Sequence, residues 1–297
     1  MIYIIVFLFL TYLILTHSSI SLYYAFHGLT LWYQKMIPSL LPFMILSGTL
    51  IRMNLSEKFV SLLHPVIKRI FRCNANVSYG IVMGFLCGFP MGAKTATDLL
   101  EEGKINLDEA RYLMSFCNNI GPVYFSSFVI PLLQIENVLL ALTGMYGIPL
   151  LYGMILRYTV FKNKISIENH SGNIKMNVSS GLLSALDSAV KNSIGSISML
   201  CGYMIIFNLL NILPHLYFPK YMMYISPVLE ITGGLVLSDN LNPFYILCLL
   251  PLGGCSCIAQ TNGIIESTKI SIREYILHKG ILTVMTIAYY LTVYSHI

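Results

Sequence analysis

The chain has 297 residues, of which 56% are hydrophobic and only 10% are charged, and its mean hydropathy is +0.72. Soluble domains carry about 25% charged residues, so the composition excludes an ordinary soluble protein and indicates an all-α polytopic membrane protein. At about 20 residues per span, we expect about seven to nine membrane segments. The net charge is +5, and the basic residues show no nucleic-acid-binding pattern, so no nucleic-acid partner is expected.

The first part of the chain predicts two spans and a surface helix. Residues 1–28 form an N-terminal transmembrane helix, because no basic region or cleavage site marks a signal peptide. Leu29–Ile51 forms the next span, and residues 57–72 alternate polar and apolar at helical spacing, as in an interfacial helix.

Residues 84–96 interrupt an apolar run with three glycines, a proline and a lysine. Where a helix is interrupted in lipid, the backbone N–H and C=O groups that lose their helical partners must bond to other protein groups or to water. Lys94 at membrane depth is also costly in free energy unless it is paired or hydrated. The stretch therefore indicates a site. The alternative is a kinked, glycine-packed helix with Lys94 reaching the surface.

The middle of the chain continues with helices and one linker. Asn106, followed three residues later by Glu109, predicts a capped helix start. Spans follow at about 107–133, which carries Asn118 and Asn119, and at about 137–161. The polar residues 162–180 predict a cytoplasmic linker. The acidic residues at 98–109 are expected on a solvated face.

The second half predicts a span at 193–213, a segment at 221–238 that either spans the membrane or lies at its surface, an interrupted segment at 244–265 and a last helix at 271–293. Cys255 and Cys257 lack further ligands, so no metal or cofactor is expected. Without a phosphate-binding loop or a hydrolase motif, neither ATP-driven transport nor enzyme activity is expected.

The two interrupted stretches align at one offset, which places Gly88 on Gly253, Glu101 on Glu266 and Lys104 on Lys269. An internal duplication with a Gly/Pro-interrupted segment in each half is typical of transporters and marks their binding site.

Basic residues cluster at 52–72 and 157–175. If both clusters face the cytoplasm, residues 77–100 must enter and leave the membrane on one side. This predicts two inverted repeats, each with a re-entrant helical hairpin and a broken or polar-centred span. The alternative is a single crossing by residues 77–100, with one cluster outside.

Helix starts at two re-entrant tips attract anions. The predicted substrate-binding residues combine tip residues with polar side chains near them: Gly88, Pro90, Gly92, Lys94, Thr95, Asn118, Asn119, Gly253, Gly254, Ser256, Gln260 and Thr261. The two asparagines can instead join helices. Glu230, in an apolar helix, is expected either to bind a coupling proton or cation or to pair with a lysine.

Three motifs carry a family resemblance: Gly88-Phe-Pro-Met-Gly-Ala-Lys94, Ser115-Phe-Cys-Asn-Asn119 and Leu229-Glu-Ile-Thr-Gly233. They resemble the sporulation integral membrane protein family called YlbJ or SpoVV. That family lies within the nucleoside-recognition gate group, which is similar to concentrative nucleoside transporters. The resemblance covers roughly residues 30–295, although the cysteines after Gly254 depart from it. It divides the chain into a first gate-like repeat with a connecting span at 29–161 and a second repeat at 181–297.

The resemblance implies transport of dipicolinic acid, an aromatic dianion, across the outer forespore membrane during sporulation. Two alternatives stay open: a nucleoside or nucleobase transporter coupled to Na⁺ or H⁺, and a non-transporting membrane scaffold for spore assembly. The expected partners are a small anionic substrate and the lipid bilayer. A homo-oligomer is compatible with the sequence, which does not fix the coupling ion or the direction of flux.

Overall fold

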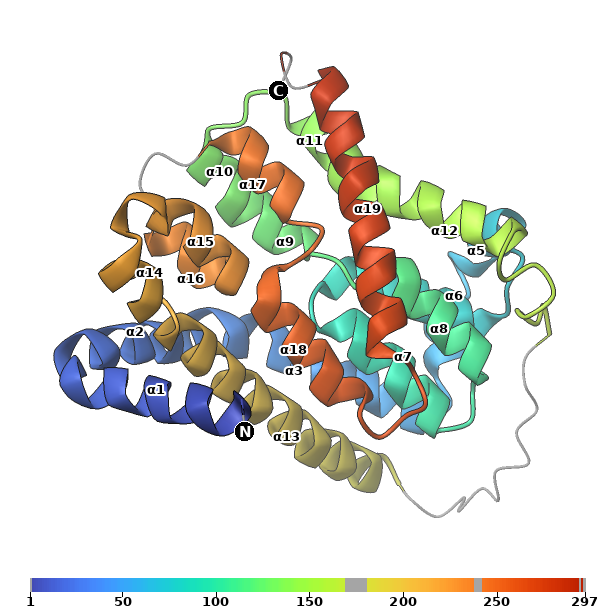
Figure 1. Ribbon diagram of the computed structural model, residues 1–297. Coiled ribbons are helices and arrows are strands. Elements are labelled where there is room, and N and C mark those ends of the chain that lie inside the picture. The colour runs from blue at the N-terminus through green and yellow to red at the C-terminus, as the bar shows by residue number, and fades with distance from the viewer. Residues whose placement is uncertain (1, 169–180, 238–241, 294, 296–297) are drawn as a thin grey trace.

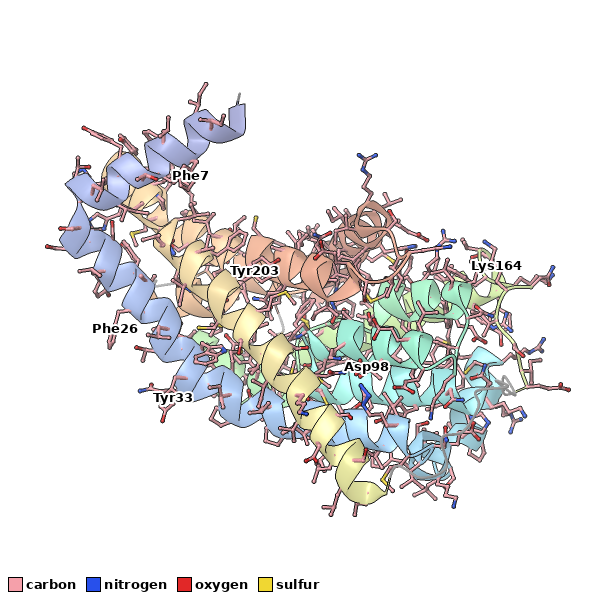
Figure 2. All side chains as sticks on the ribbon, turned by 90° about the horizontal axis from the view of Figure 1, so that it is seen from below. Phe7, Phe26, Tyr33, Asp98, Lys164 and Tyr203 are labelled. Carbon is pink, nitrogen blue, oxygen red and sulfur yellow. The ribbon has the colours of Figure 1, made fainter. Side chains whose placement is uncertain are left out.

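The computed structural model describes residues 2–168, 181–237, 242–293 and 295, so most of the predicted linker at 162–180 lies outside the described residues. The described residues form helices and no strands (Figure 1). Among the described residues, five helices are long and apolar enough to cross a membrane: Ser18–Arg52, Val138–Tyr158, Leu182–Tyr217, Pro243–Ile265 and Ile272–Val293. Large apolar side chains such as Phe7, Phe26 and Tyr33 extend from the outer surface (Figure 2). The chain is therefore an integral membrane protein.

Two long helices lie side by side across the molecule (Figures 1 and 2). After α1 (Ile2–Thr16), α2 (Ser18–Leu31) runs through the π-helical turn η1 (Trp32–Met36) into α3 (Ile37–Arg52) without a break. The predicted boundary after residue 28 thus falls inside one helix. The second long helix is α13 (Leu182–Leu209), which continues into α14 (Ile212–Tyr217).

Glycines set the approach of these long helices. Gly28 packs on the backbone of Met204, and Gly48 packs on Ala189. Because residue numbers rise along one helix as they fall along the other, the two helices are antiparallel. Between these contacts, the Trp32 indole nitrogen donates to the Ile197 carbonyl oxygen at 2.8 Å.

A helical hairpin follows the short helices α4 (Ser56–Val60) and α5 (His64–Phe71). Its arms are α6 (Ala75–Cys87) and α7 (Met91–Glu101), which we call the first hairpin. Gly84 on one arm and Gly92 on the other both pack against Cys117, so the arms fold back on each other. Arms of 13 and 11 residues are too short to cross a membrane.

A broken span comes next. α8 (Leu107–Phe116) begins at the predicted capping box, in which the side chains of Asn106 and Glu109 each bond the other's backbone N–H. Residues 117–121 then leave the helix, which resumes in α9 (Pro122–Tyr124), η2 (Phe125–Val129) and α10 (Ile130–Leu133). We call α8–α10 the first broken span. The chain returns through α11 (Val138–Leu142), η3 (Thr143–Gly147) and α12 (Ile148–Tyr158).

The second half repeats this order of elements. After α13, α14 and a short turn η4 (Pro219–Tyr221), the helices α15 (Met222–Leu229) and α16 (Ile231–Leu237) pack against each other as a second hairpin, with Gly234 against the backbone of Pro227. The second broken span consists of α17 (Pro243–Leu249) and α18 (Gly254–Ile265), and α19 (Ile272–Val293) ends the chain.

The position of the second hairpin corrects the sequence analysis. Residues 244–265 were expected to form it, but α17 and α18 scarcely contact each other, although only four residues join them. They continue in one general direction instead (Figure 1). The predicted pairing of Gly88 with Gly253 therefore joins unlike positions. In the order of elements, the tip at Gly88 matches the tip at Glu230, and Gly253 matches the break at 117–121.

The loops of several elements gather at one end of the molecule. Arg111 at the start of α8 bonds both Glu274 carboxylate oxygens, at 2.8 and 3.0 Å. Ser267 donates to Glu101 at 2.6 Å, and Arg52 donates to Glu102 at 3.2 Å. Both ends of the first hairpin lie here, and we call this end the basic end.

The described parts of the two basic clusters also lie together at the basic end. Arg157 donates to the carbonyl oxygens of Phe71 and Arg72 at 2.8 Å, and the Arg72 guanidinium lies 5.6 Å from the Tyr158 ring. The acidic residues nearby are less exposed than expected, because Asp98 and Glu109 are buried. Asp98 pairs with Lys94, and Glu109 accepts from Asn74 at 2.8 Å.

Candidate functional site

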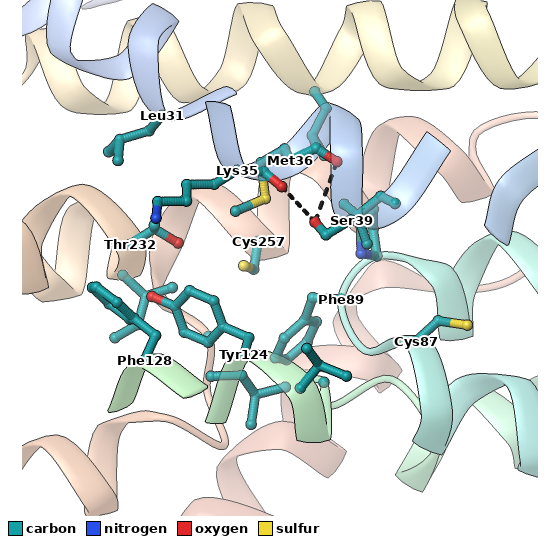
Figure 3. Close-up of a pocket in the computed structure, with 18 of the residues that line it drawn as sticks. Leu31, Lys35, Met36, Ser39, Cys87, Phe89, Tyr124, Phe128, Thr232 and Cys257 are labelled. Atoms are coloured by element: carbon teal, nitrogen blue, oxygen red, sulfur yellow. Dashed lines mark hydrogen bonds between the residues drawn. The ribbon is translucent and has the colours of Figure 1, made fainter. Parts of the chain in front are cut away.

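A cavity of about 340 Å³ lies where the two hairpins and the two broken spans meet. The first hairpin contributes Phe89 and Pro90 at its tip, and the second contributes Glu230 and Thr232. The breaks contribute Ile120, Gly121 and Gly253, and α18 contributes Cys257 and Gln260. The segments η1 and α3 form a further wall that includes Lys35 and Ser39 (Figure 3). Segments from both halves of the chain therefore build a single pocket.

The tip of the first hairpin packs directly on the first broken span. Gly88 has a positive φ of 79° and lies against the backbone of Gly121, where a Cβ would clash. A Cβ on Gly121 would in turn lie 2.8 Å from the Cys87 carbonyl oxygen. Gly88, Gly92 and Gly121 thus allow two backbones to approach closely, and the first two do not line the pocket.

Two successive glycines connect both hairpins to the second broken span. Gly253 and Gly254 have φ values of 76° and 79°. A Cβ on Gly253 would lie 2.9 Å from the Phe89 ring, and a Cβ on Gly254 would lie 3.1 Å from the carbonyl oxygens of Pro227 and Val228. Each glycine therefore faces the tip region of a different hairpin.

Glu230 occupies the tip of the second hairpin and is 2% exposed. Its carboxylate accepts from the backbone N–H groups of Thr232 at 3.1 Å and Gly233 at 2.5 Å, and from the Asn208 side chain at 3.2 Å. A carboxylate in this place caps the start of α16 and complements the helix dipole. Glu230 also borders the pocket.

The starts of α7 and α18 differ in whether a side chain caps their N–H groups, which decides whether those groups remain available to an anion. At α7, Asn118 accepts from the Ala93 N–H at 3.2 Å. At α18, no side chain within the described part of the chain caps the start, which faces the pocket through Gly253 and Cys257. The first-turn N–H groups of α18 belong to residues that do not line the pocket, so these uncapped helix-terminal donors lie beside the pocket.

Asn118 joins three elements around the pocket wall. Besides capping α7, its amide nitrogen donates to the Thr261 hydroxyl at 3.1 Å and to the Tyr275 hydroxyl at 3.0 Å. Asn118 is fully buried and does not line the pocket. The structure thus gives it the joining role that the sequence left as an alternative.

Lys279 on α19 lies behind the tip of the first hairpin. Its ammonium group donates to the Asn118 carbonyl oxygen and, at 3.0 Å, to the Asn119 side-chain oxygen. It also lies 4.5 Å from the centre of the Phe89 ring and 5.7 Å from that of Tyr275. The side chain is 1% exposed, so Phe89 separates this cation from the pocket.

The structure gathers the sequence-predicted residues only in part. Pro90, Gly253, Gln260 and Glu230 line the pocket. The others do not line it: Gly88, Gly92, Lys94, Thr95, Asn118, Asn119, Gly254, Ser256 and Thr261. Of these, Ser256 accepts from the Gln260 amide at 2.9 Å and so orients a lining residue.

Lys94 is the main correction at the site. It was expected to place a free positive charge beside the tip, but it forms an ion pair with Asp98 one helical turn later. Both side chains are largely buried, with 12% and 9% exposed. The pair is close to neutral as a unit, so Lys94 contributes little net charge to the pocket.

Two functional candidates, Lys35 and Lys279, escaped the sequence analysis. Each is a basic residue within a helix that is long and apolar enough to cross a membrane. Such a residue is unfavourable in a membrane span unless it faces a cavity or a partner. The same signal marks Lys94 and identifies both of these residues. The pocket-lining aromatic residues Phe89, Tyr124 and Phe128 carried no comparable signal.

Comparison with known proteins matches the first part of the chain. Residues 33–133 match the family model described as Gate, nucleoside recognition. A stretch of 118 residues is 37% identical to the sporulation integral membrane protein YlbJ of Bacillus subtilis (strain 168). This alignment covers 40% of the chain and only 29% of that relative. No solved structure matches the chain.

Proposed function

Since the Gate match and the YlbJ alignment support the place of this chain in the YlbJ family, we propose that it is a secondary transporter for a small aromatic carboxylate such as dipicolinic acid. The observation that carries the proposal is the pocket between two hairpin tips and two broken spans. Broken helices around a midplane pocket are a recurring architecture of transporter binding sites. The relative is named a sporulation integral membrane protein, and from that name we extend the proposal to endospore formation, with the outer forespore membrane as the proposed location.

The pocket has chemistry for both parts of such a substrate. Phe89, Tyr124 and Phe128 offer aromatic surfaces to a planar ring (Figure 3). The uncapped start of α18 and the Lys35 ammonium group can each bind a carboxylate. A volume of about 340 Å³ is also within the range of small-molecule pockets.

Glu230 offers a way to couple movement of the substrate to movement of a proton. An ionised Glu230 would repel a dianion in the same pocket, because like charges in a poorly hydrated site interact strongly. In the proposed cycle, a proton joins Glu230 as the substrate enters and leaves with it. The proton therefore travels in the same direction as the anion.

The arrangement of the hairpins supports alternating access. Both ends of the first hairpin lie at the basic end. The second hairpin begins beside the start of α17, where the Tyr245 hydroxyl donates to the Tyr224 carbonyl oxygen at 2.7 Å. We propose that the hairpins enter the membrane from opposite sides as inverted repeats, so that opening either one exposes the pocket to one compartment.

A nucleoside or nucleobase is the second candidate, because Glu230 and Gln260 both border the pocket. A carboxylate and an amide are suited to the hydroxyl and N–H groups of such ligands. The description of the matched family model favours the same class.

Uptake into proteoliposomes separates the two candidates. We expect labelled dipicolinate to enter faster as the outside pH falls, and excess nucleoside to leave that uptake unchanged. Lys35→Met should reduce uptake at least about tenfold through loss of one charged hydrogen bond, whereas Lys58→Met, at a residue that does not line the pocket, should not. Nucleoside uptake that dipicolinate fails to inhibit would contradict the carboxylate assignment, and absence of uptake of either class would contradict transport.

A further inference from the structure

The environment of the Lys279 ammonium group resembles a metal-cation site. Its hydrogen-bond partners are a main-chain carbonyl oxygen from Asn118 and an amide oxygen from Asn119, and two aromatic faces lie close to it. None of the salt bridges within the described residues includes Lys279. The cation is therefore held by neutral oxygens and rings.

These oxygens gather because the first broken span stops at this point. α8 ends at Phe116, and residues 117–121 turn away from the helical path. Carbonyl groups at the end of α8 carry the negative end of its dipole, which attracts a cation. The Asn119 amide nitrogen donates to the Phe116 carbonyl oxygen at 2.5 Å, and this bond turns the Asn119 side-chain oxygen toward Lys279.

Na⁺ in transporters binds the same kinds of groups, namely carbonyl oxygens of unwound backbone at a half-helix end. Here the ammonium group at the end of a long side chain from α19 already occupies that place. The aromatic contact with Phe89 extends its influence to the tip of the first hairpin.

We propose that Lys279 is a built-in cation, which fills the site that a coupling Na⁺ would otherwise take and holds the first hairpin against the first broken span. The position beside Asn118 and Asn119 is then not vacant for Na⁺. This inference goes beyond the proposed function, because it concerns the ion requirement of the fold and depends on no substrate.

Removing the lysine should create a sodium site. Lys279→Ala leaves the oxygens of Asn118 and Asn119 beside a small cavity, and a cation that binds only the folded state raises its melting temperature. We expect the purified variant to melt at least about 3 °C higher in sodium chloride than in choline chloride at equal ionic strength. The wild type and the exposed Lys58→Ala variant should melt at the same temperature in both salts.

A second variant keeps the experiment decisive if alanine folds poorly. Lys279→Ser adds a hydroxyl ligand to the same oxygens and should show the same dependence on sodium. Sodium-specific stabilisation of the wild type would overturn the proposal, because the site would then be vacant. Failure of both variants to gain stability in sodium, whether folded or not, would overturn it too. Neither result depends on uptake, so the proposed transport function is tested separately.

Discussion

At the scale of single residues, Phe89 contacts three parts of the candidate site. One part of its ring borders the pocket, the Lys279 ammonium group lies over it, and Gly253 packs on its edge. A side chain shared by a cavity, a buried cation and a second backbone has little freedom to move alone. The tip of the first hairpin is therefore expected to move together with the second broken span.

Gly253→Ala tests this packing. The substitution places a Cβ 2.9 Å from the Phe89 ring at a residue whose φ is 76°. We expect a loss of about 1–2 kcal/mol in the free energy of unfolding from backbone strain alone, together with reduced uptake. Gly280→Ala is the matched control, since no neighbouring atom lies within 4 Å of its added Cβ. Thermal unfolding of both variants in detergent would show the difference, and equal melting temperatures would contradict the packing described.

Lys94 and Asp98 provide a second test at this scale, because they distinguish a structural ion pair from a substrate site. Lys94→Met leaves the Asp98 carboxylate largely buried without its partner and should cost about 3 kcal/mol in stability. Lys94→Met combined with Asp98→Asn should recover much of that loss. A direct role in binding instead predicts a stable single variant that cannot take up substrate, and a double variant no better than the single one. Melting temperature and uptake, measured on both variants, decide between the two.

At the scale of elements, two helix starts near the pocket are capped by side chains from non-helical residues. Asn118 in the first break caps α7, and Glu230 between the arms of the second hairpin caps α16. Polar residues at these breaks thus replace backbone hydrogen bonds that the membrane cannot supply. The start of α18 lacks such a cap among the described side chains, which leaves its donors for a ligand.

Asn118→Ala should loosen the first hairpin without unfolding the protein. The variant loses the acceptor for the Ala93 N–H and the donor to Thr261 and Tyr275. We expect faster hydrogen exchange at residues 91–95 and 257–261, with the long helices α3 and α13 unchanged, and a cost of about 1–3 kcal/mol. Exchange rates equal to those of the wild type at both segments would show that Asn118 does not join them.

The sequence predicted the elements that carry a local signal. The capping pair at Asn106 and Glu109 and the interruption around Gly88 both follow from residue types at fixed spacing. The position of the second hairpin was predicted wrongly, because a Gly/Pro interruption fits a hairpin tip and a broken membrane crossing equally well. Only tertiary packing shows that the chain turns back at Glu230 and continues past Gly253. For the same reason, sequence order did not show that Lys279 faces Asn118 from 161 residues away.

At the scale of the whole molecule, each half of the chain contributes a long helix, a hairpin and a broken span. The antiparallel pair of α2–α3 and α13 flanks the site, and η1 and α3 form one wall of the pocket. The first hairpin returns to the basic end, where both positive clusters lie. The proposed mechanism requires the second hairpin to return to the opposite side of the membrane.

The sidedness of the hairpin ends tests this central claim most directly. Single cysteines at Arg72, Glu102, Tyr221, Asn242 and Ser267, in a variant without native cysteines, would be labelled in cells and in inverted vesicles with an impermeant thiol reagent. The account predicts labelling of positions 72, 102 and 267 from one side, and of positions 221 and 242 from the other. Labelling of 72 and 102 from different sides, or of all five from the same side, would contradict it.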